Sequence, residues 1–249
     1  MIPYELDAGA GQGRRFGVIV LSTDTSLEHE AGGAMAGHPV NLLHARIPAN
    51  AHVTPDDLST MEAQMTTTAG RLPQGLAAVG YGCTSGATVI GSDRVANLVN
   101  AAHPGVPVTD PARAVMAALH HLGTRRIALV SPYVPSVTGP LVALFAQNGI
   151  EVLTEASFGQ SEDWTVGRIT EASTAAAMLE LGRTPGVEAV FSSCTNLRSF
   201  GIIDAVEAEL GLPVISSNLA LLWHMLRLSG VKDYHGWAPG RLFQIGETA

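Results

Sequence analysis

The 249-residue sequence predicts an α/β protein of two similar doubly wound parallel-sheet domains, related by a pseudo-two-fold axis, with a site in the cleft between them. Short continuous apolar runs alternate with amphipathic stretches, a pattern typical of parallel strands covered by helices on both faces. Four such runs occur in the same order in each half of the chain. The third run of each half ends at a cysteine, Cys83 in the first and Cys194 in the second.

The composition is that of a compact α/β enzyme with enough chain for a sizeable core. Hydrophobic residues make up 46% of the sequence and charged residues 14%, which argues against disorder. The net charge of −8 argues against a general nucleic-acid or anionic-membrane surface. No apolar run reaches the roughly 18 residues that span a bilayer, and residues 1–15 lack the apolar core of a signal peptide. We therefore expect a cytoplasmic protein with reduced thiols and no membrane or nucleic-acid partner.

The first half contains four strand candidates and a clear helix start. Its apolar runs are residues 14–22, 39–47 and 78–84, and a run that begins at Pro107. Between the second and third runs, Thr54-Pro55-Asp56-Asp57 supplies an N-cap, a proline at the first helical position and acids in the first turn. These features predict a helix that starts at Pro55.

The second half repeats this pattern. Its apolar runs are residues 125–131, 149–156 and 189–195, and a run that begins at Pro213. Apolar residues at three- and four-residue spacing predict helices over 136–148, 165–182, 197–210 and 218–228. The last of these is expected to pass back onto the first half. The predicted domains are therefore residues 12–118 plus 219–249, and residues 119–218.

The positions of the two cysteines support a duplication. Cys83 follows Arg14 by 69 residues, and Cys194 follows Arg125 by the same 69 residues. In open parallel sheets, ligands bind beyond the carboxyl ends of the strands, where we expect both cysteines to precede a helix. A helix start binds anions such as carboxylates and lowers the pKa of a thiol from about 8.5.

Two thiols that face each other across a cleft suit one type of chemistry. Removal of a proton from the carbon beside a carboxylate, and its return on the opposite face, needs a base on one side and an acid on the other. Backbone N–H groups and hydroxyls around the carboxylate would stabilise the carbanion. The alternative is that both cysteines are small core residues. Their matching offsets, each before a threonine at a strand end, favour the acid–base pair.

Five segments carry a resemblance to a known superfamily across almost the whole chain. They are VLSTDTSLE at 20–28, GCTSG at 82–86, SPY at 131–133, DWTVGR at 163–168 and SSCTN at 192–196. They resemble the Asp/Glu racemase superfamily, in particular its branch of maleate cis-trans isomerases and arylmalonate decarboxylases. The racemase-like proteins linked to ectoine breakdown are similar too. The resemblance implies two catalytic cysteines in racemases and maleate isomerases, and a single one in decarboxylases.

The resemblance also implies a set of substrate-binding residues. Thr84, Ser85 and Tyr133 would hold a substrate carboxylate, and Thr195 would assist beside Cys194. An alternative for Tyr133 is a simple aromatic residue at a strand end.

Two acids depart from the maleate isomerase pattern, which has asparagine at both positions. They are Asp24 and Asp163. An ionised aspartate only accepts hydrogen bonds, and two of them beside a dicarboxylate would be repulsive. By resemblance to the amino acid racemases, Asp24 would lie near a substrate amino group. The sequence therefore favours a substrate with a cationic nitrogen, or a cyclic amidine, besides its carboxylate. The alternatives are a helix N-cap for Asp24 and an exposed loop acid for Asp163.

No motif indicates a metal or a cofactor. The histidines lack ligand spacing, and the glycines around Cys83 match neither a phosphate loop nor a serine nucleophile elbow. We predict a cofactor-independent racemase or epimerase of a small, amino-acid-like carboxylate, with Cys83 and Cys194 as acid and base. Maleate-type cis-trans isomerisation by thiolate addition, arylmalonate-type decarboxylation and a two-lobed carboxylate-binding protein are the alternatives. The sequence leaves a homo-oligomer open.

Overall fold

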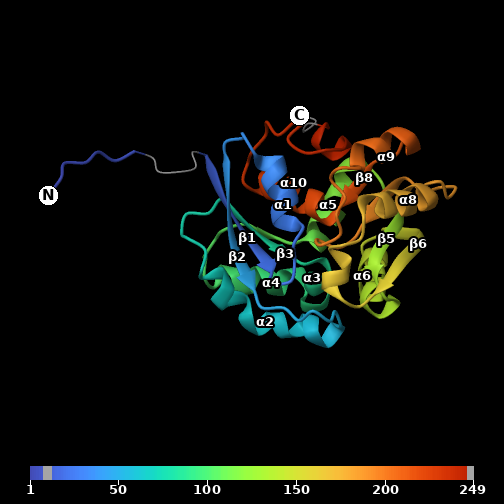
Figure 1. Cartoon of the computed structure of the whole chain (residues 1–249), viewed down its shortest axis with the longest axis horizontal. Coiled ribbons are helices and arrows are strands. Elements are labelled where there is room, and N and C mark those ends of the chain that lie inside the picture. The colour runs from blue at the N-terminus through green and yellow to red at the C-terminus, as the bar shows by residue number, and fades with distance from the viewer. Residues whose placement is uncertain (8–12, 246–249) are drawn as a thin grey trace.

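The fold consists of two parallel four-stranded sheets with helices packed against them (Figure 1). The computed structural model describes residues 1–7 and 13–245. The first sheet has the strand order β2-β1-β3-β4 and the second has the order β6-β5-β7-β8. The strands are β1 (Arg14–Leu21), β2 (Val40–Ile47), β3 (Ala78–Gly82), β4 (Val108–Thr109), β5 (Arg126–Tyr133), β6 (Glu151–Gln160), β7 (Ala189–Ser192) and β8 (Val214–Ser216). This arrangement confirms the predicted fold class.

The registers of the two sheets repeat each other. Phe16 on β1 pairs with Ala78 on β3, and Ile127 on β5 pairs with Ala189 on β7. Phe16 and Ile127 each follow by two residues the arginine that opens their repeat. The two repeats therefore match in strand register as well as in sequence spacing. The carboxyl ends of β3 and β7 are consequently placed at equivalent points of the two sheets.

Helices pack against both sheets, and several of them begin at capping residues that the sequence contains. Thr54 accepts a hydrogen bond from the Asp57 N–H ahead of α2, and Asp110 caps α5 in the same way. The helices are α1 (Leu27–Met35), α2 (Pro55–Ala69), α3 (Thr84–Ile90), α4 (Ser92–Asn100), α5 (Pro111–Leu122), α6 (Pro135–Gln147), α7 (Asp163–Val166), α8 (Glu171–Gly182), α9 (Ile203–Leu210) and α10 (Ser217–Leu228), with a 3₁₀ turn at Arg241–Phe243. None of the helices in the described ranges has the length and apolar content of a bilayer-spanning segment.

Two predicted helices of the second half are wrong in extent. The helix expected over 165–182 is two helices, α7 and α8, because the chain turns at Gly167. The turn packs closely against the first half, where a Cβ added to Gly167 would lie 2.8 Å from Thr25 Oγ1. A new helix starts only after Thr170 caps α8. The helix expected over 197–210 is the shorter α9, since a side chain of the first half takes up the N–H groups of Ser199 and Phe200.

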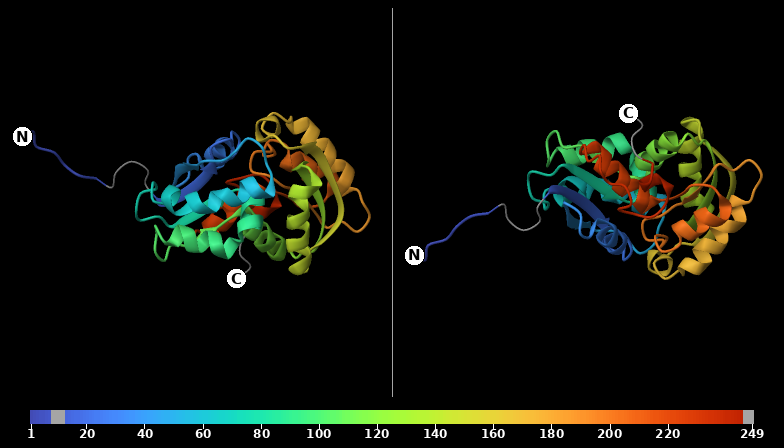
Figure 2. Two further views of the ribbon diagram at one scale, coloured as in Figure 1. Left: turned by 90° about the horizontal axis from the view of Figure 1, so that it is seen from below. Right: turned by 90° about the horizontal axis from the view of Figure 1, so that it is seen from above.

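The last helix returns to the first sheet. α10 packs against α5 and β3, and an added Cβ on Gly80 of β3 would lie 2.6 Å from Met225 Sδ. Both views of Figure 2 show this red C-terminal helix among the blue and green elements of the first half. The predicted boundaries, residues 12–118 plus 219–249 against 119–218, stay a prediction, and their residues 12 and 246–249 lie outside the described residues.

Glu30 joins the two halves behind the site. Its Oε1 accepts the N–H groups of Ser199 at 2.7 Å and Phe200 at 3.0 Å, and its Oε2 accepts Asn218 Nδ2 at 2.7 Å. Asn218 also donates to the carbonyl of Thr195 at 2.8 Å. Burial raises the pKa of Glu30, because the carboxylate is withdrawn from water. A single side chain on α1 thus holds the loop that follows Cys194.

Glu30→Ala is expected to lower the free energy of unfolding by about 3 kcal/mol, since each buried donor left without its acceptor costs about 1–3 kcal/mol. Urea unfolding measures this loss. The matched control is Glu28→Ala on the same helix, which removes an ion pair with Arg46 at a half-exposed position. The control should cost less than about 1 kcal/mol. A loss at Glu30 no greater than that of the control would show that Glu30 does not hold the loop that follows Cys194.

Candidate active site

A small buried cavity lies between the two halves, at the carboxyl ends of β3 and β7. Its volume is about 20 Å³, enough for one water-sized molecule. Both cysteines and every predicted substrate-binding residue except Asp24 line it. The lining residues are Leu21, Val53, Cys83, Thr84, Ser85, Tyr133, Asp163, Cys194 and Thr195. One thiol therefore comes from each copy of the repeat.

Cys83 stands where β3 gives way to α3, as the sequence predicts. Its Sγ accepts the Gly86 N–H at 3.2 Å, so the thiol itself caps the helix. An added Cβ on Gly86 would lie 2.9 Å from this sulfur and 2.5 Å from the Tyr81 hydroxyl. Only glycine leaves the thiol in place. The next residue, Thr84, has its hydroxyl 2.8 Å from that of Ser217.

Cys194 has a different environment from the one that the sequence predicts. No helix follows it until Ile203, so its expected position at a helix start is wrong. Its backbone has φ of 108°, a left-handed conformation that costs a non-glycine residue of order 1–3 kcal/mol. Its N–H donates to Ser217 Oγ at 3.0 Å, and its Sγ accepts the Asn196 N–H at 3.4 Å. Surrounding contacts thus hold a strained residue with its sulfur toward the cavity.

The expected lowering of the thiol pKa values is also wrong. Burial raises the pKa of Cys83 to about 12, which outweighs the favourable Gly86 N–H. Burial also raises the pKa of Cys194 well above its ordinary value, and the charge of Asp163 adds to this effect. Both side chains are therefore thiols in the free site at neutral pH. A positive charge bound nearby would favour the thiolates.

Asp163 is buried in the cavity wall, so its interpretation as an exposed loop acid is wrong. Only 2% of the residue is exposed. The Tyr133 hydroxyl donates to its Oδ1 at 2.9 Å, and the Thr23 hydroxyl donates to its Oδ2 at 2.5 Å. The same Tyr133 oxygen lies 3.3 Å from Cys194 Sγ. Tyr133 is therefore more than an aromatic residue at a strand end.

Asp24 lies close to Thr195 and Asp163 of the cavity wall and precedes α1, whose N-cap residue is Ser26. Its Oδ1 accepts the N–H groups of Ser26 at 2.8 Å and Leu27 at 2.9 Å, so it binds the start of the helix from two residues before the N-cap position. Burial raises the pKa of Asp24, and the neighbouring charge of Asp163 contributes in the same direction. None of the ion pairs in the described part of the chain involves either aspartate. The site thus contains two buried acids without a basic partner.

Two loops close the cavity, one from each half. The Val53 N–H donates to Ser161 O at 2.9 Å, and the Asp163 N–H donates to Ala51 O at 2.9 Å. On the outer side, His52 Nδ1 lies 2.8 Å from Glu162 Oε1. Val53 also lines the cavity. The cavity holds about one water-sized molecule, so a larger substrate needs its walls to move apart.

Sequence reasoning missed several residues that build the site. Thr23 binds Asp163, Gly86 binds Cys83, Ser217 binds Cys194 and Val53 lines the cavity. Thr23 directly precedes Asp24, and Gly86 follows Cys83 by three residues. Both lie within segments that carry the family resemblance, so their positions were a usable signal. Nothing in the sequence distinguishes Val53 or Ser217, because their roles arise from contacts between distant segments.

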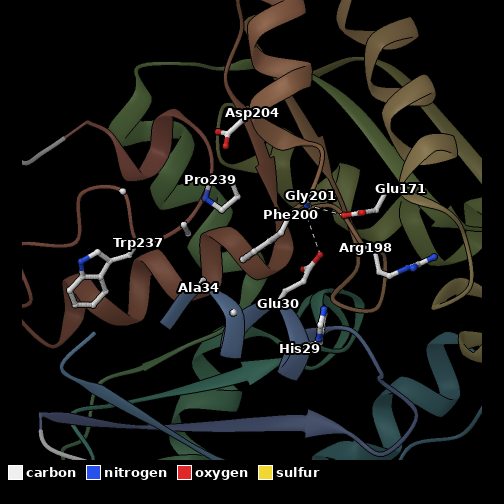
Figure 3. A pocket seen from close by; sticks show the side chains of 13 residues that line it. His29, Glu30, Ala34, Glu171, Arg198, Phe200, Gly201, Asp204, Trp237 and Pro239 are labelled. Carbon is white, nitrogen blue, oxygen red and sulfur yellow. Dashed lines mark hydrogen bonds between the residues drawn. The ribbon is translucent and has the colours of Figure 1, made fainter. Parts of the chain in front are cut away.

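A larger pocket of about 620 Å³ lies away from both thiols, between α1 and the loop before α9 (Figure 3). Its acids already have partners: Glu30 binds the backbone at Phe200, and Glu171 accepts the Gly201 N–H at 2.9 Å. Glu30 and Glu171 therefore anchor the loop before α9. The small cavity that both thiols line is the better candidate for chemistry. The described residues contain no group of three or more His, Cys, Asp or Glu side chains that could hold a metal ion.

Comparison with known proteins identifies the family. Residues 32–243 match the family model of arylmalonate decarboxylase. The chain belongs to the arylmalonate decarboxylase family. A relative in this group, the maleate isomerase of Geobacillus stearothermophilus, is 25% identical over 234 residues, which cover 88% of this chain and 93% of the relative. The arylmalonate decarboxylase of Bordetella bronchiseptica is 32% identical over 142 residues, 56% of this chain and 58% of that enzyme.

The fold is also that of solved structures in this branch. The Nocardia farcinica maleate cis-trans isomerase with a covalently bound succinylcysteine intermediate has a TM-score of 0.83 and 24% identity, and the alignment covers 92% of this chain and 98% of that one. The resemblance to maleate isomerases and arylmalonate decarboxylases is thereby confirmed. The named relatives in this family act on maleate or arylmalonates, which are small carboxylates.

Proposed function

We propose that this chain is a cofactor-independent racemase or epimerase of a small carboxylate that carries a cationic nitrogen, with Cys83 and Cys194 as acid and base. One observation carries the proposal. A thiol from each half lines the same cavity, and a buried carboxylate, that of Asp163, lies in its wall without an ion-pair partner among the described residues. This arrangement supports proton transfer on two opposite faces of one carbon.

In the proposed reaction, the thiolate of one cysteine takes the proton from the carbon beside the carboxylate, and the bonding electrons stay on that carbon. The thiol of the other cysteine then gives its proton to the opposite face. The hydroxyls of Thr84 and Ser85 would hold the carboxylate, and the negative charge that develops there would be stabilised by these donors. After turnover the two sulfurs have exchanged protonation states, so the reverse reaction starts from the product.

The two acids support a cationic group on the substrate. Asp24 and Asp163 are 1% and 2% exposed, and a second substrate carboxylate beside them would be repelled. A cationic nitrogen would instead be attracted. It would also offset the negative charge that contributes to the raised pKa values of Cys83 and Cys194. Substrate binding would thus assist thiolate formation.

Solvent isotope exchange tests the proposal. Single enantiomers of small amino-acid-like carboxylates are incubated with the enzyme in deuterated water and followed by NMR and polarimetry. We expect deuterium at the α-carbon together with loss of optical activity. Conversion of maleate to fumarate with no exchange of any amino-acid-like compound would overturn the proposal.

A maleate-type cis-trans isomerase is the second candidate, and the presence of both thiols in a relative of maleate isomerases favours it. In that reaction a thiolate adds to the double bond, the resulting single bond rotates, and elimination releases the trans product. The two buried acids count against a dianionic substrate. Single-cysteine decarboxylation is less favoured because Cys83 is present, and a binding protein would show no turnover in either assay.

A further inference from the structure

We infer that Tyr133 is a hydrogen-bond switch, through which a cation bound at Asp163 promotes the ionisation of Cys194. The inference deepens the proposed function, on which its biological meaning rests. It makes Tyr133 more than a carboxylate ligand and gives the two thiols different means of activation.

The switch follows from the number of protons at one oxygen. The Tyr133 hydroxyl lies 2.9 Å from Asp163 Oδ1 and 3.3 Å from Cys194 Sγ, and all three residues are buried. A phenol has a single proton, so it can donate fully to only one of these two neighbours. The other neighbour must do without it or donate to the phenol oxygen.

In the empty site the carboxylate wins the proton. An ionised carboxylate accepts a stronger hydrogen bond than a neutral thiol does, and the Tyr133 hydroxyl donates to Asp163 Oδ1. The Cys194 S–H can then donate to the same phenol oxygen. This arrangement stabilises the thiol and disfavours the thiolate, so the free enzyme keeps Cys194 unreactive.

A cation at Asp163 reverses the preference. It offsets the charge of the carboxylate and so weakens it as an acceptor, and the Tyr133 O–H turns to Cys194 Sγ. The thiol proton leaves to solvent, the electron pair stays on sulfur, and the Tyr133 proton stays on its own oxygen and changes only its partner. The remaining donor to this sulfur is the Asn196 N–H at the longer distance of 3.4 Å.

Cys83 is not controlled in this way. Its sulfur accepts the backbone N–H of Gly86, which no carboxylate competes for. The pseudo-symmetric site is thus chemically asymmetric, because a switch acts on one thiol only. Because the charge of Asp163 also raises the pKa of Cys83, this cysteine serves as the reference for the effect of Tyr133→Phe within each background.

A double-mutant cycle tests the switch without any substrate. The natural chain, Tyr133→Phe, Asp163→Leu and the double variant are treated with iodoacetamide at pH 8, and the alkylation rates at Cys194 and Cys83 are measured by mass spectrometry. With Asp163 in place, Tyr133→Phe should not slow Cys194 and should leave its rate unchanged or faster, because the phenol proton is held by Asp163 and the variant removes only the bond from the thiol to the phenol oxygen. In the Asp163→Leu background the same change should slow Cys194 about tenfold or more, since it removes a hydrogen bond to a charged sulfur.

An equal effect of Tyr133→Phe in both backgrounds would overturn the switch, as would an equal coupling at Cys83. If Asp163→Leu does not fold, a second experiment adds small cations to the natural chain and to Tyr133→Phe. Ammonium chloride, whose cation is water-sized, should speed Cys194 alkylation in the natural chain about tenfold over tetramethylammonium chloride at equal ionic strength, and less in Tyr133→Phe. No difference between the two salts in the natural chain would also overturn it. These results are independent of isotope exchange, so a failed switch and a failed racemase proposal are distinguishable.

Discussion

Cys83→Ser and Cys194→Ser are each expected to slow α-proton exchange by about a thousandfold, because a positioned acid or base typically contributes 10²–10⁴-fold. A serine hydroxyl has nearly the same shape as a thiol but ionises far less readily. The fold and the substrate affinity should therefore persist while proton transfer is lost. Deuterium incorporation measured by NMR gives the rate, and isothermal titration of the substrate gives the affinity.

The two variants together separate the reaction classes. Two-sided proton transfer needs both thiols, so both variants must lose activity. A single-cysteine reaction, such as decarboxylation, would lose activity in only one of them. The matched control is Ser192→Ala, on β7 two residues before Cys194, where the buried hydroxyl has no hydrogen-bond partner among the described residues. Its rate should stay within about twofold of the natural chain. Full activity of either cysteine variant would contradict the acid–base pair.

The sequence was sufficient to predict the fold and the meeting of the cysteines. Parallel strands buried on both faces leave continuous apolar runs, and a duplication repeats their order and spacing. The carboxyl ends of equivalent strands then lie at equivalent places, which brings Cys83 and Cys194 to one cavity. These inferences depend on local periodicity and on the order of the strands along the chain, and both can be read directly from the sequence.

The missing features depend on contacts between distant segments. Residues 197–202 have helical spacing, but Glu30, far away in the sequence, binds the N–H groups at Ser199 and Phe200. Local periodicity contains no trace of that contact. The same holds for the thiol pKa values, because the degree of burial depends on the closure of the cavity by Val53 and its loop. Burial of Asp163, likewise, follows from its contacts with Thr23 and Tyr133.

Asp163→Asn should have the second large effect, through substrate charge. A buried acid that holds a cationic nitrogen contributes about 2–5 kcal/mol, so kcat/KM for the amino-acid-like substrate should fall about a hundredfold or more. The amide is nearly the same size and still accepts a hydrogen bond from Tyr133. The loss therefore reports charge and not shape. Steady-state kinetics with cationic and neutral analogues of one carboxylate measures it, and the neutral analogue should lose much less.

The matched control is Glu162→Gln, which removes one negative charge at the adjacent residue on the outer side of the loop, where Glu162 pairs with His52. This change should leave the preference between the cationic and neutral analogues within about twofold, because an exposed charge is screened by water. Maleate provides the opposite test. If Asp163 repels a second carboxylate, Asp163→Asn should bind maleate more tightly than the natural chain does. An unchanged preference for the cationic analogue, with no gain for maleate, would show that Asp163 does not bind the substrate nitrogen and would remove the main argument against a dicarboxylate substrate.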